Sequence, residues 1–133
     1  MTEPIRVPGD PSPILRAHLA GQLATREPGT TFGLVLPDDW KPKSPAHVLV
    51  ADDGGPMRWP ISSRPRMRIT VYADGRTKAR RIAGLCLGIV LSQRVEGIAQ
   101  MLDPTAVFDA RDPHTGGVLA FFTFAATVRT RVV

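Results

Sequence analysis

Residues 64–93 of the chain read RPRMRITVYADGRTKARRIAGLCLGIVLSQ, and this stretch decides the fold. Its first part alternates between apolar and polar positions, and the apolar set is Met67, Ile69, Val71 and Ala73. A period of two predicts a β-strand that buries one face. In the second part the apolar residues recur at helical spacing: Ala79, Ile82, Ala83, Cys86, Ile89 and Val90. The stretch therefore predicts a strand that leads directly into an amphipathic helix.

Local sequence also indicates how this helix begins and packs. Asp74 precedes the helix and is expected to cap it. Gly84 and Gly88 lie inside the helix, where each glycine costs about 1 kcal/mol relative to alanine. Close packing of the helix against a sheet would explain glycines at these two positions.

The N-terminal part of the chain predicts an arm and a second helix. Residues 1–11 are rich in proline and glycine and are expected to form a flexible arm. Ser12 and Pro13 then resemble an N-cap followed by a first-turn proline. An apolar stripe at four-residue spacing predicts an amphipathic helix of about three turns, formed by Leu15, Leu19 and Leu23. The sequence Glu-Pro-Gly at 27–29 ends it.

Short strands and loops are expected between the two helices. The strands are predicted at residues 32–36, 47–51 and 57–61. Pro60 confines the last of these to a sheet edge. Residues 37–45 contain three prolines and predict an exposed loop, and Asp-Asp-Gly-Gly at 52–55 predicts a tight turn.

The last third of the chain predicts a long hairpin after an irregular segment at 94–103. A strand at 106–111 and a returning strand at 118–132 flank a loop at 112–117. Both alternating sets of the returning strand are partly apolar, so both of its faces should be covered. The helices can cover one face, and a neighbouring subunit is the simplest candidate to cover the other.

These elements predict one α/β domain of the α+β type over residues 12–133. Its sheet is mainly antiparallel, with two principal helices packed on it and a long C-terminal hairpin. The length of 133 residues suits a single domain. The sequence shows neither a membrane-length apolar run nor a signal-peptide pattern, and its one cysteine excludes an internal disulfide. We expect a soluble protein made in a reducing cytoplasm.

Positive charge is concentrated in the same region that decides the fold. Between Arg58 and Arg81 there are eight basic residues and one acid, a charge of +7, whereas the whole chain carries +5. Three interpretations stay open: solvated arginines around a core helix, a surface for an acidic protein partner, or contact with nucleic acid. Tyr72 is the one aromatic residue inside the basic run, which is few for a nucleic-acid module.

Residue patterns typical of catalysis are weak. His18, His47 and His114 are scattered and have no partner at metal-ligand spacing, and Cys86 falls on the apolar stripe. The acid pair Asp52 and Asp53 is better explained as turn chemistry. The strand-to-helix turn at 74–77 lacks the glycine and lysine pattern of a phosphate-binding loop. We therefore expect no catalytic, metal-binding or cofactor-binding residues, and no enzyme activity.

Several segments in order resemble a known family. They are a helix, a strand ending in Asp-Asp-Gly-Gly at 52–55, the strand at 64–73, the helix from Arg76 to Cys86, and Asp-Ala-Arg-Asp-Pro-His-Thr-Gly-Gly-Val-Leu-Ala-Phe-Phe-Thr-Phe at 109–124. In this order they resemble the tail terminator proteins of long-tailed (siphovirus-type) phages of actinobacteria, from about residue 12 to 133.

The resemblance implies a hexameric ring that caps the head-proximal end of the tail tube. Such a ring stops tube polymerisation and joins the tail to the head. It implies as partners further copies of the chain, the tail tube protein and the head–tail connector or neck proteins. The genome would pass through the ring without sequence-specific binding, and no membrane is involved. The chain would be assembled in the cytoplasm of the host bacterium and end in the virion tail.

No catalytic residue is carried over by the resemblance, so the candidate sites are contact residues. They come from the basic run and from the two loops, because loops on a rigid scaffold often carry binding. The candidates are Arg66, Arg68, Arg76, Arg80, Arg81, Asp112, His114 and Trp40. We expect charge reversal at Arg80 to leave the fold intact and impair assembly. A neck or head-completion adaptor, a nucleic-acid-binding accessory protein and a small enzyme are the alternatives, in that order.

Overall fold

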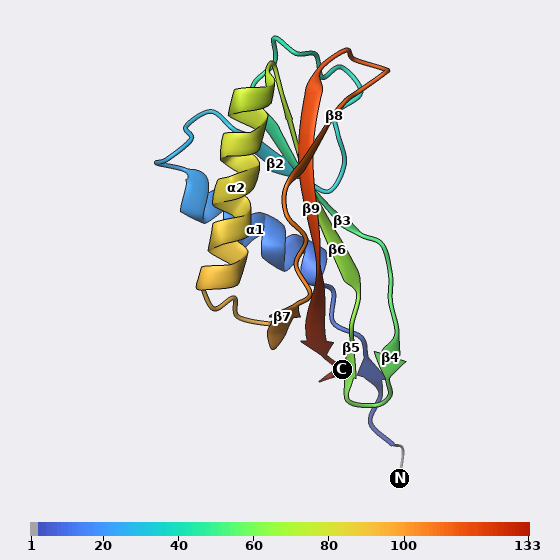
Figure 1. Cartoon of the computed structure of the whole chain (residues 1–133). Coiled ribbons are helices and arrows are strands. Elements are labelled where there is room, and N and C mark those ends of the chain that lie inside the picture. The colour runs from blue at the N-terminus through green and yellow to red at the C-terminus, as the bar shows by residue number, and fades with distance from the viewer. Residues whose placement is uncertain (1–2) are drawn as a thin grey trace.

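The computed structural model describes residues 3–133 as an α+β fold with both principal helices on one side of a mixed sheet (Figure 1). The sheet order is β2-β3-β6-β9-β5-β4, and β7 and β8 pair with the other edge of β9. The β2–β3 pair is parallel and the other pairings are antiparallel. A separate two-stranded ribbon joins β1 to β10 near the chain ends. This confirms the predicted fold class.

The bounds of the twelve elements follow the chain. They are β1 (Arg6–Val7), α1 (Pro11–Leu23), β2 (Thr31–Gly33), β3 (His47–Asp52), β4 (Met57–Arg58), β5 (Ser62–Ser63), β6 (Arg66–Ala73), α2 (Arg76–Ser92), β7 (Gln100–Leu102), β8 (Phe108–Arg111), β9 (Val118–Arg129) and β10 (Arg131–Val132). The predicted strand at 118–132 is thus interrupted at Thr130. The predicted irregular segment at 94–103 contains β7, which pairs with β9.

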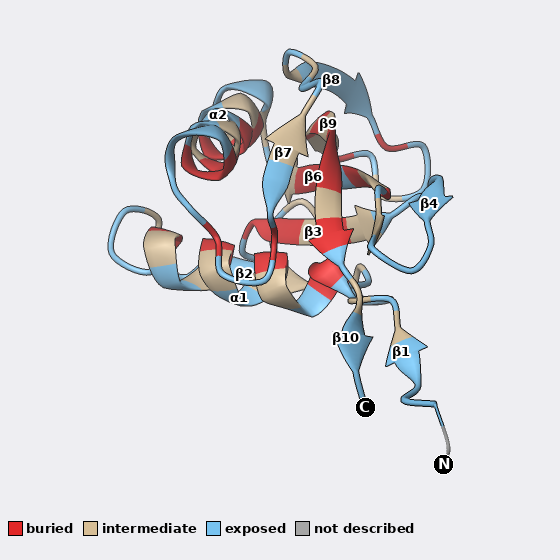
Figure 2. Ribbon diagram, turned by 90° about the horizontal axis from the view of Figure 1, so that it is seen from below, coloured by how far each residue is buried: buried red, intermediate tan, exposed pale blue. Residues whose placement is uncertain are grey.

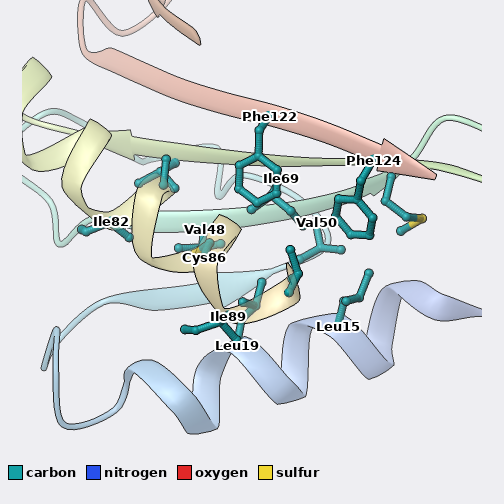
Figure 3. Packing of buried hydrophobic residues seen from close by; sticks show 14 of the residues in the cluster. Leu15, Leu19, Val48, Val50, Ile69, Ile82, Cys86, Ile89, Phe122 and Phe124 are labelled. Atoms are coloured by element: carbon teal, nitrogen blue, oxygen red, sulfur yellow. The ribbon is translucent and has the colours of Figure 1, made fainter. Parts of the chain in front are cut away.

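The strand-to-helix stretch forms as its periodicity predicts. The apolar set of β6 is fully buried, and so are the six apolar stripe residues of α2, apart from slight exposure of Ile89 and Val90. Phe122 and Phe124 of β9 point from the sheet toward the helices, where Leu15 and Leu19 of α1 and Cys86 of α2 meet them (Figure 3). This cluster is the core of the domain.

Helix ends and turns depart from the sequence expectations. Asp10 caps α1 by accepting a hydrogen bond from the backbone N–H of Ser12 at 3.2 Å, so the cap lies two residues before the predicted one. Gly75 occupies the N-cap of α2 without a side-chain hydrogen bond, so the expected cap by Asp74 is wrong. Proline and aspartate patterns marked both helix starts correctly but misplaced the capping residue.

The segment 52–55 is not a tight turn. The backbone N–H of Asp53 donates to the carbonyl of Arg66, and the N–H of Arg66 donates to the carbonyl of Gly54, so the chain continues alongside β6. Its direction reverses at residues 59–61, between β4 and β5. The long two-strand arm formed in this way ends in an exposed hairpin at the edge of the sheet, as Pro60 predicts.

The predicted arm at residues 1–11 contains local structure. Residues 1 and 2 lie outside the described residues. Arg6 and Val7 pair with Val132 and Arg131, which ties this segment to the C-terminal end of the chain. Figure 2 shows β1 and β10 side by side, away from both helices.

The two glycines of α2 do not pack against the sheet. Both lie on the exposed side of the helix, and a Cβ atom added at Gly84 or Gly88 would meet nothing within 4 Å. The expected close packing is therefore wrong.

Replacing these glycines should stabilise the free subunit. Gly84→Ala and Gly88→Ala are each expected to raise the free energy of unfolding by about 1 kcal/mol, because alanine restricts the unfolded chain and clashes with nothing here. Urea unfolding followed by circular dichroism measures the change. Gly97→Ala serves as the control and should destabilise, since its φ is +94° and its Cβ would lie 2.9 Å from Ile14 Cδ1. A loss of stability in either α2 variant would contradict the open surface.

Candidate interaction surfaces

The predicted contact residues do not form one patch. Arg66 and Arg68 lie on β6, on the sheet face away from the helices, whereas Arg76, Arg80 and Arg81 lie on the first turns of α2. Each group meets a different set of partners within the subunit.

The arginines of α2 are neutralised by acids from distant segments. Asp109 of β8 accepts from Arg80 Nη1 at 2.7 Å and from Arg76 Nε at 3.2 Å. Glu27, just after α1, accepts from Arg81 Nε at 2.7 Å and Nη2 at 3.2 Å. The hydrogen bond from Arg80 lowers the pKa of Asp109, and the hydrogen bond from Arg81 lowers the pKa of Glu27. The positive start of α2 is thus balanced inside the subunit.

The arginines of β6 are also engaged. Arg66 donates from Nη2 to Thr123 Oγ1 at 2.7 Å and to the carbonyl of Asp103 at 2.9 Å. Arg68 pairs with Asp53 at 3.3 Å, with both side chains partly exposed. An internal role accounts for both residues.

The remaining three candidates sit around the loop between β8 and β9. Asp112 is buried and folds this loop: it accepts from the backbone N–H of His114 at 3.0 Å and from Thr115 Oγ1 at 2.8 Å. These hydrogen bonds, the one from Thr115 foremost, lower its pKa. Trp40 is only 5% exposed, packs edge-on against Tyr72, and donates to the carbonyl of Pro45. His114 alone is presented to the outside.

Arg81 and Glu27 make a testable contribution to the pH dependence of stability. Because the pKa of Glu27 is lowered from 4.5 in the folded state, its ion pair stabilises the fold above that value, and this is lost as pH falls through the folded pKa. Glu27→Gln should therefore be less stable than wild type at pH 7, with the difference shrinking from about pH 5 to about pH 3. Denaturant titrations at several pH values test this. A difference that is constant with pH would contradict it.

The sheet face away from the helices is only partly covered. On β9, Phe122 and Phe124 are fully buried beneath the helices, whereas Leu119 and Phe121 of the opposite face are half-buried. Phe121 contacts Phe108 of β8 at a ring-centroid distance of 5.5 Å, and Phe108 is 52% exposed. We call this surface the open face; its residues are Leu49, Ala51, Arg68, Thr70, Phe108, Leu119, Phe121 and Thr123.

The histidines and the cysteine occupy separate places. His47 is buried, with Nδ1 2.7 Å from Thr31 Oγ1 and Nε2 2.9 Å from the carbonyl of Val35, and burial lowers its pKa. His18 contacts Gln93. Burial raises the pKa of Cys86 to about 12, so its thiol stays protonated. Among residues 3–133, no three His, Cys, Asp or Glu side chains gather as metal ligands would.

A groove of about 1130 Å³ lies between the start of α1, the 94–99 loop and the end of β9. Its lining combines apolar side chains such as Ile14 and Val128 with two acids and three arginines. Asp10, one of the two acids, is already used as the cap of α1.

Sequence reasoning missed one surface entirely. Arg6, Arg129 and Arg131 lie outside the basic run, yet the fold brings them beside the hairpin that carries Arg58 and Arg64. The signal for this surface was limited to the apolar alternation of the edge hairpin.

Comparison with known proteins gives no family. The chain matches no protein-family model, and a search of curated proteins finds no match either. In the part of the chain that the structure describes, no helix combines the length and apolarity needed to cross a bilayer.

Proposed function

We propose that this chain is the tail terminator of a long-tailed phage, a structural protein rather than an enzyme. Six copies would form a ring on the head-proximal end of the tail tube. The ring would stop tube polymerisation and join the tail to the connector or neck proteins of the head. The order of sequence segments that resembles this family is the starting point of the proposal.

The open face carries the proposal. β9 is apolar on both sides, but the subunit covers only one of them fully, and Phe108 stays half exposed beside Phe121. A second protein surface is the natural cover for such a face. Another copy of the chain supplies it when subunits assemble.

A ring needs two different surfaces on each subunit. In a closed cyclic assembly beyond a dimer, one patch of each copy meets another patch of the next. The open face and the outer side of α2 lie on opposite sides of the sheet, and the outer side is smooth at Gly84 and Gly88. The open face of one subunit would pack against the outer side of α2 in its neighbour.

Termination then follows from shape rather than chemistry. The side of the ring that meets the tube matches the top of the tube, and the other side differs, so no further tube ring adds. DNA passes through the lumen with no sequence readout. The protein would accordingly be found in the virion, at the head end of the tail.

An image of the intact particle, with this chain located by a tag, tests the proposal. The expected result is six copies at the head-proximal end of the tail. Twelve copies on the portal side would instead identify a neck or head-completion adaptor. Absence of the chain from the tail would refute the role altogether.

A further inference from the structure

Nearly all of the net charge of the chain lies at one end of the molecule. We call this end the basic–apolar pole and define it as residues 3–9, 57–64 and 129–133. It contains five arginines and one acid, Glu3, a side-chain charge of +4 out of +5 for the chain. The arginines are Arg6, Arg58, Arg64, Arg129 and Arg131. The rest of the chain is therefore close to neutral.

Hydrogen bonds make the pole one continuous surface. The backbone N–H of Thr130 donates to the carbonyl of Ile61 at 3.0 Å, and its hydroxyl donates to the carbonyl of Pro60. The N–H of Val133 donates to the carbonyl of Ile5 at 3.0 Å. Figure 1 shows β4, β5 and both chain ends together at the lower end of the molecule, opposite the β8–β9 loop.

The charge at the pole is not compensated within the subunit. All four ion pairs of the described residues involve other arginines, on β6 and α2. Arg6 donates to Thr130 Oγ1, and all five pole arginines are exposed.

The pole also gathers most of the exposed apolar side chains. Of the ten large apolar residues that are exposed in the described chain, six are here: Ile5, Met57, Trp59, Ile61, Val132 and Val133. Trp59 is 59% exposed. Tryptophan and arginine together are the residues that most often dominate binding energy at protein interfaces.

We infer that the basic–apolar pole is a docking surface for a protein that presents carboxylates around an apolar pocket. Charge complementarity selects the acidic rim, because carboxylates would neutralise arginines that have no acid of their own. The apolar pocket is required by Trp59 and its neighbours, which charge alone leaves exposed to water. The inference concerns one surface and holds apart from the ring; within the proposed function, the partner is the tube or a neck protein.

Other occupants fit less well. Phosphates of a nucleic acid would pair with the arginines but would leave the aliphatic side chains uncovered, and Trp59 offers a single base-stacking platform. Lipid would cover the apolar groups but could not satisfy the free backbone groups along the edge of β4, whereas a protein strand could. Two poles would repel each other at +4 apiece, and the remainder of the chain offers no strong acidic excess.

Fluorescence of Trp59 tests the inference directly. In a Trp40→Phe background Trp59 is the one tryptophan left, so its emission reports the pole alone. The probe is a synthetic peptide that alternates glutamate and leucine. Binding should shift the emission to the blue and weaken as salt rises. If Trp40→Phe does not fold, iodide quenching in the native sequence gives the same readout, since Trp40 is buried.

Two pairs of variants separate the two components of the surface. Arg58→Glu with Arg64→Glu, and Met57→Ser with Ile61→Ser, should each weaken peptide binding tenfold or more. The matched controls lie elsewhere on the surface: Lys41→Glu with Lys43→Glu makes the same charge change, and Val35→Ser removes an exposed apolar residue. Both controls should stay within twofold of wild type.

Three results would overturn the inference. One is the absence of peptide binding, or equal binding by the pole variants and the controls. Another is tighter binding of phosphatidylglycerol vesicles or duplex DNA than of the peptide, with loss in the same variants. The third is self-association that persists at high salt and disappears in the pole variants. A chain that binds the peptide but is absent from phage tails would refute the proposed function and leave this inference standing.

Discussion

Phe122→Asp is expected to leave the chain unfolded. Phe122 is fully buried between β9 and the helices, beside Ile69 and Val50 (Figure 3). Removing the ring alone costs about 3–5 kcal/mol, and an ionised carboxylate without a partner in this core costs several more. Since a domain of this kind is stable by about 5–15 kcal/mol, the sum exhausts most or all of its stability. Circular dichroism and amide exchange should show an unfolded chain.

The neighbouring residue provides the matched control. Thr123 is next in the same strand but faces the open side, where Arg66 already donates to its hydroxyl. Thr123→Asp introduces the same charge one position away, and the guanidinium of Arg66 can pair with it. This variant should fold. If both aspartate variants fold equally well, the assignment of the two faces of β9 is wrong.

Hydrophobic periodicity predicted the central elements because burial alone decides them. Every apolar residue singled out on β6 and on α2 lies in the core, and the long C-terminal strand, its hairpin and the edge hairpin form as expected. A period of two or of 3.6 is a property of many residues at once, so single exceptions do not erase it.

Features that depend on one residue were predicted less well. Asp74 and Asp52 both carry side chains suited to caps and turns, but neither does what local chemistry suggested. Asp52 Oδ1 accepts from the N–H of Gly54 without reversing the chain, because that segment hydrogen-bonds to Arg66 of a distant strand. Long-range pairing overrides a local turn signal at such positions.

The electrostatic prediction failed for the same reason. The acids that neutralise α2 are 29 residues away for Arg80 and 54 residues away for Arg81. The pole, in turn, is assembled from three segments that are each only weakly charged in the sequence. Charge runs along a sequence therefore gave the number of cations and not the surface on which they stay unpaired.

This finding changes what a substitution at Arg80 can report. Arg80 donates to Asp109 Oδ1 and to the carbonyl of Val107, so Arg80→Glu would place two carboxylates together and detach β8 from α2. Impaired assembly of that variant would not separate a lost contact from a loosened strand. A residue on the open face gives a cleaner test of assembly.

Phe108→Asp is expected to leave the subunit folded and to prevent ring formation. Phe108 is half exposed, so its loss costs the subunit mainly the contact with Phe121, about 0.5–1.5 kcal/mol. In a ring, the same carboxylate would be buried at every one of the repeated contacts, at a cost of several kcal/mol each. Native mass spectrometry, alone and with assembled tail tubes, should show monomer where wild type forms hexamers, with at least a hundredfold weaker assembly.

A charge on another surface isolates the open face as the cause. Ala17 lies on the exposed side of α1, so Ala17→Asp adds one carboxylate without touching β8 or β9. It should fold and assemble like wild type, because a solvated charge there meets no subunit contact in the proposed packing. Normal rings from Phe108→Asp would show that the open face stays in water in the assembly, and the packing proposed for the ring would then be wrong. Loss of rings in both variants would instead mean that added negative charge alone prevents assembly, a result that supplementing the buffer with salt would reverse.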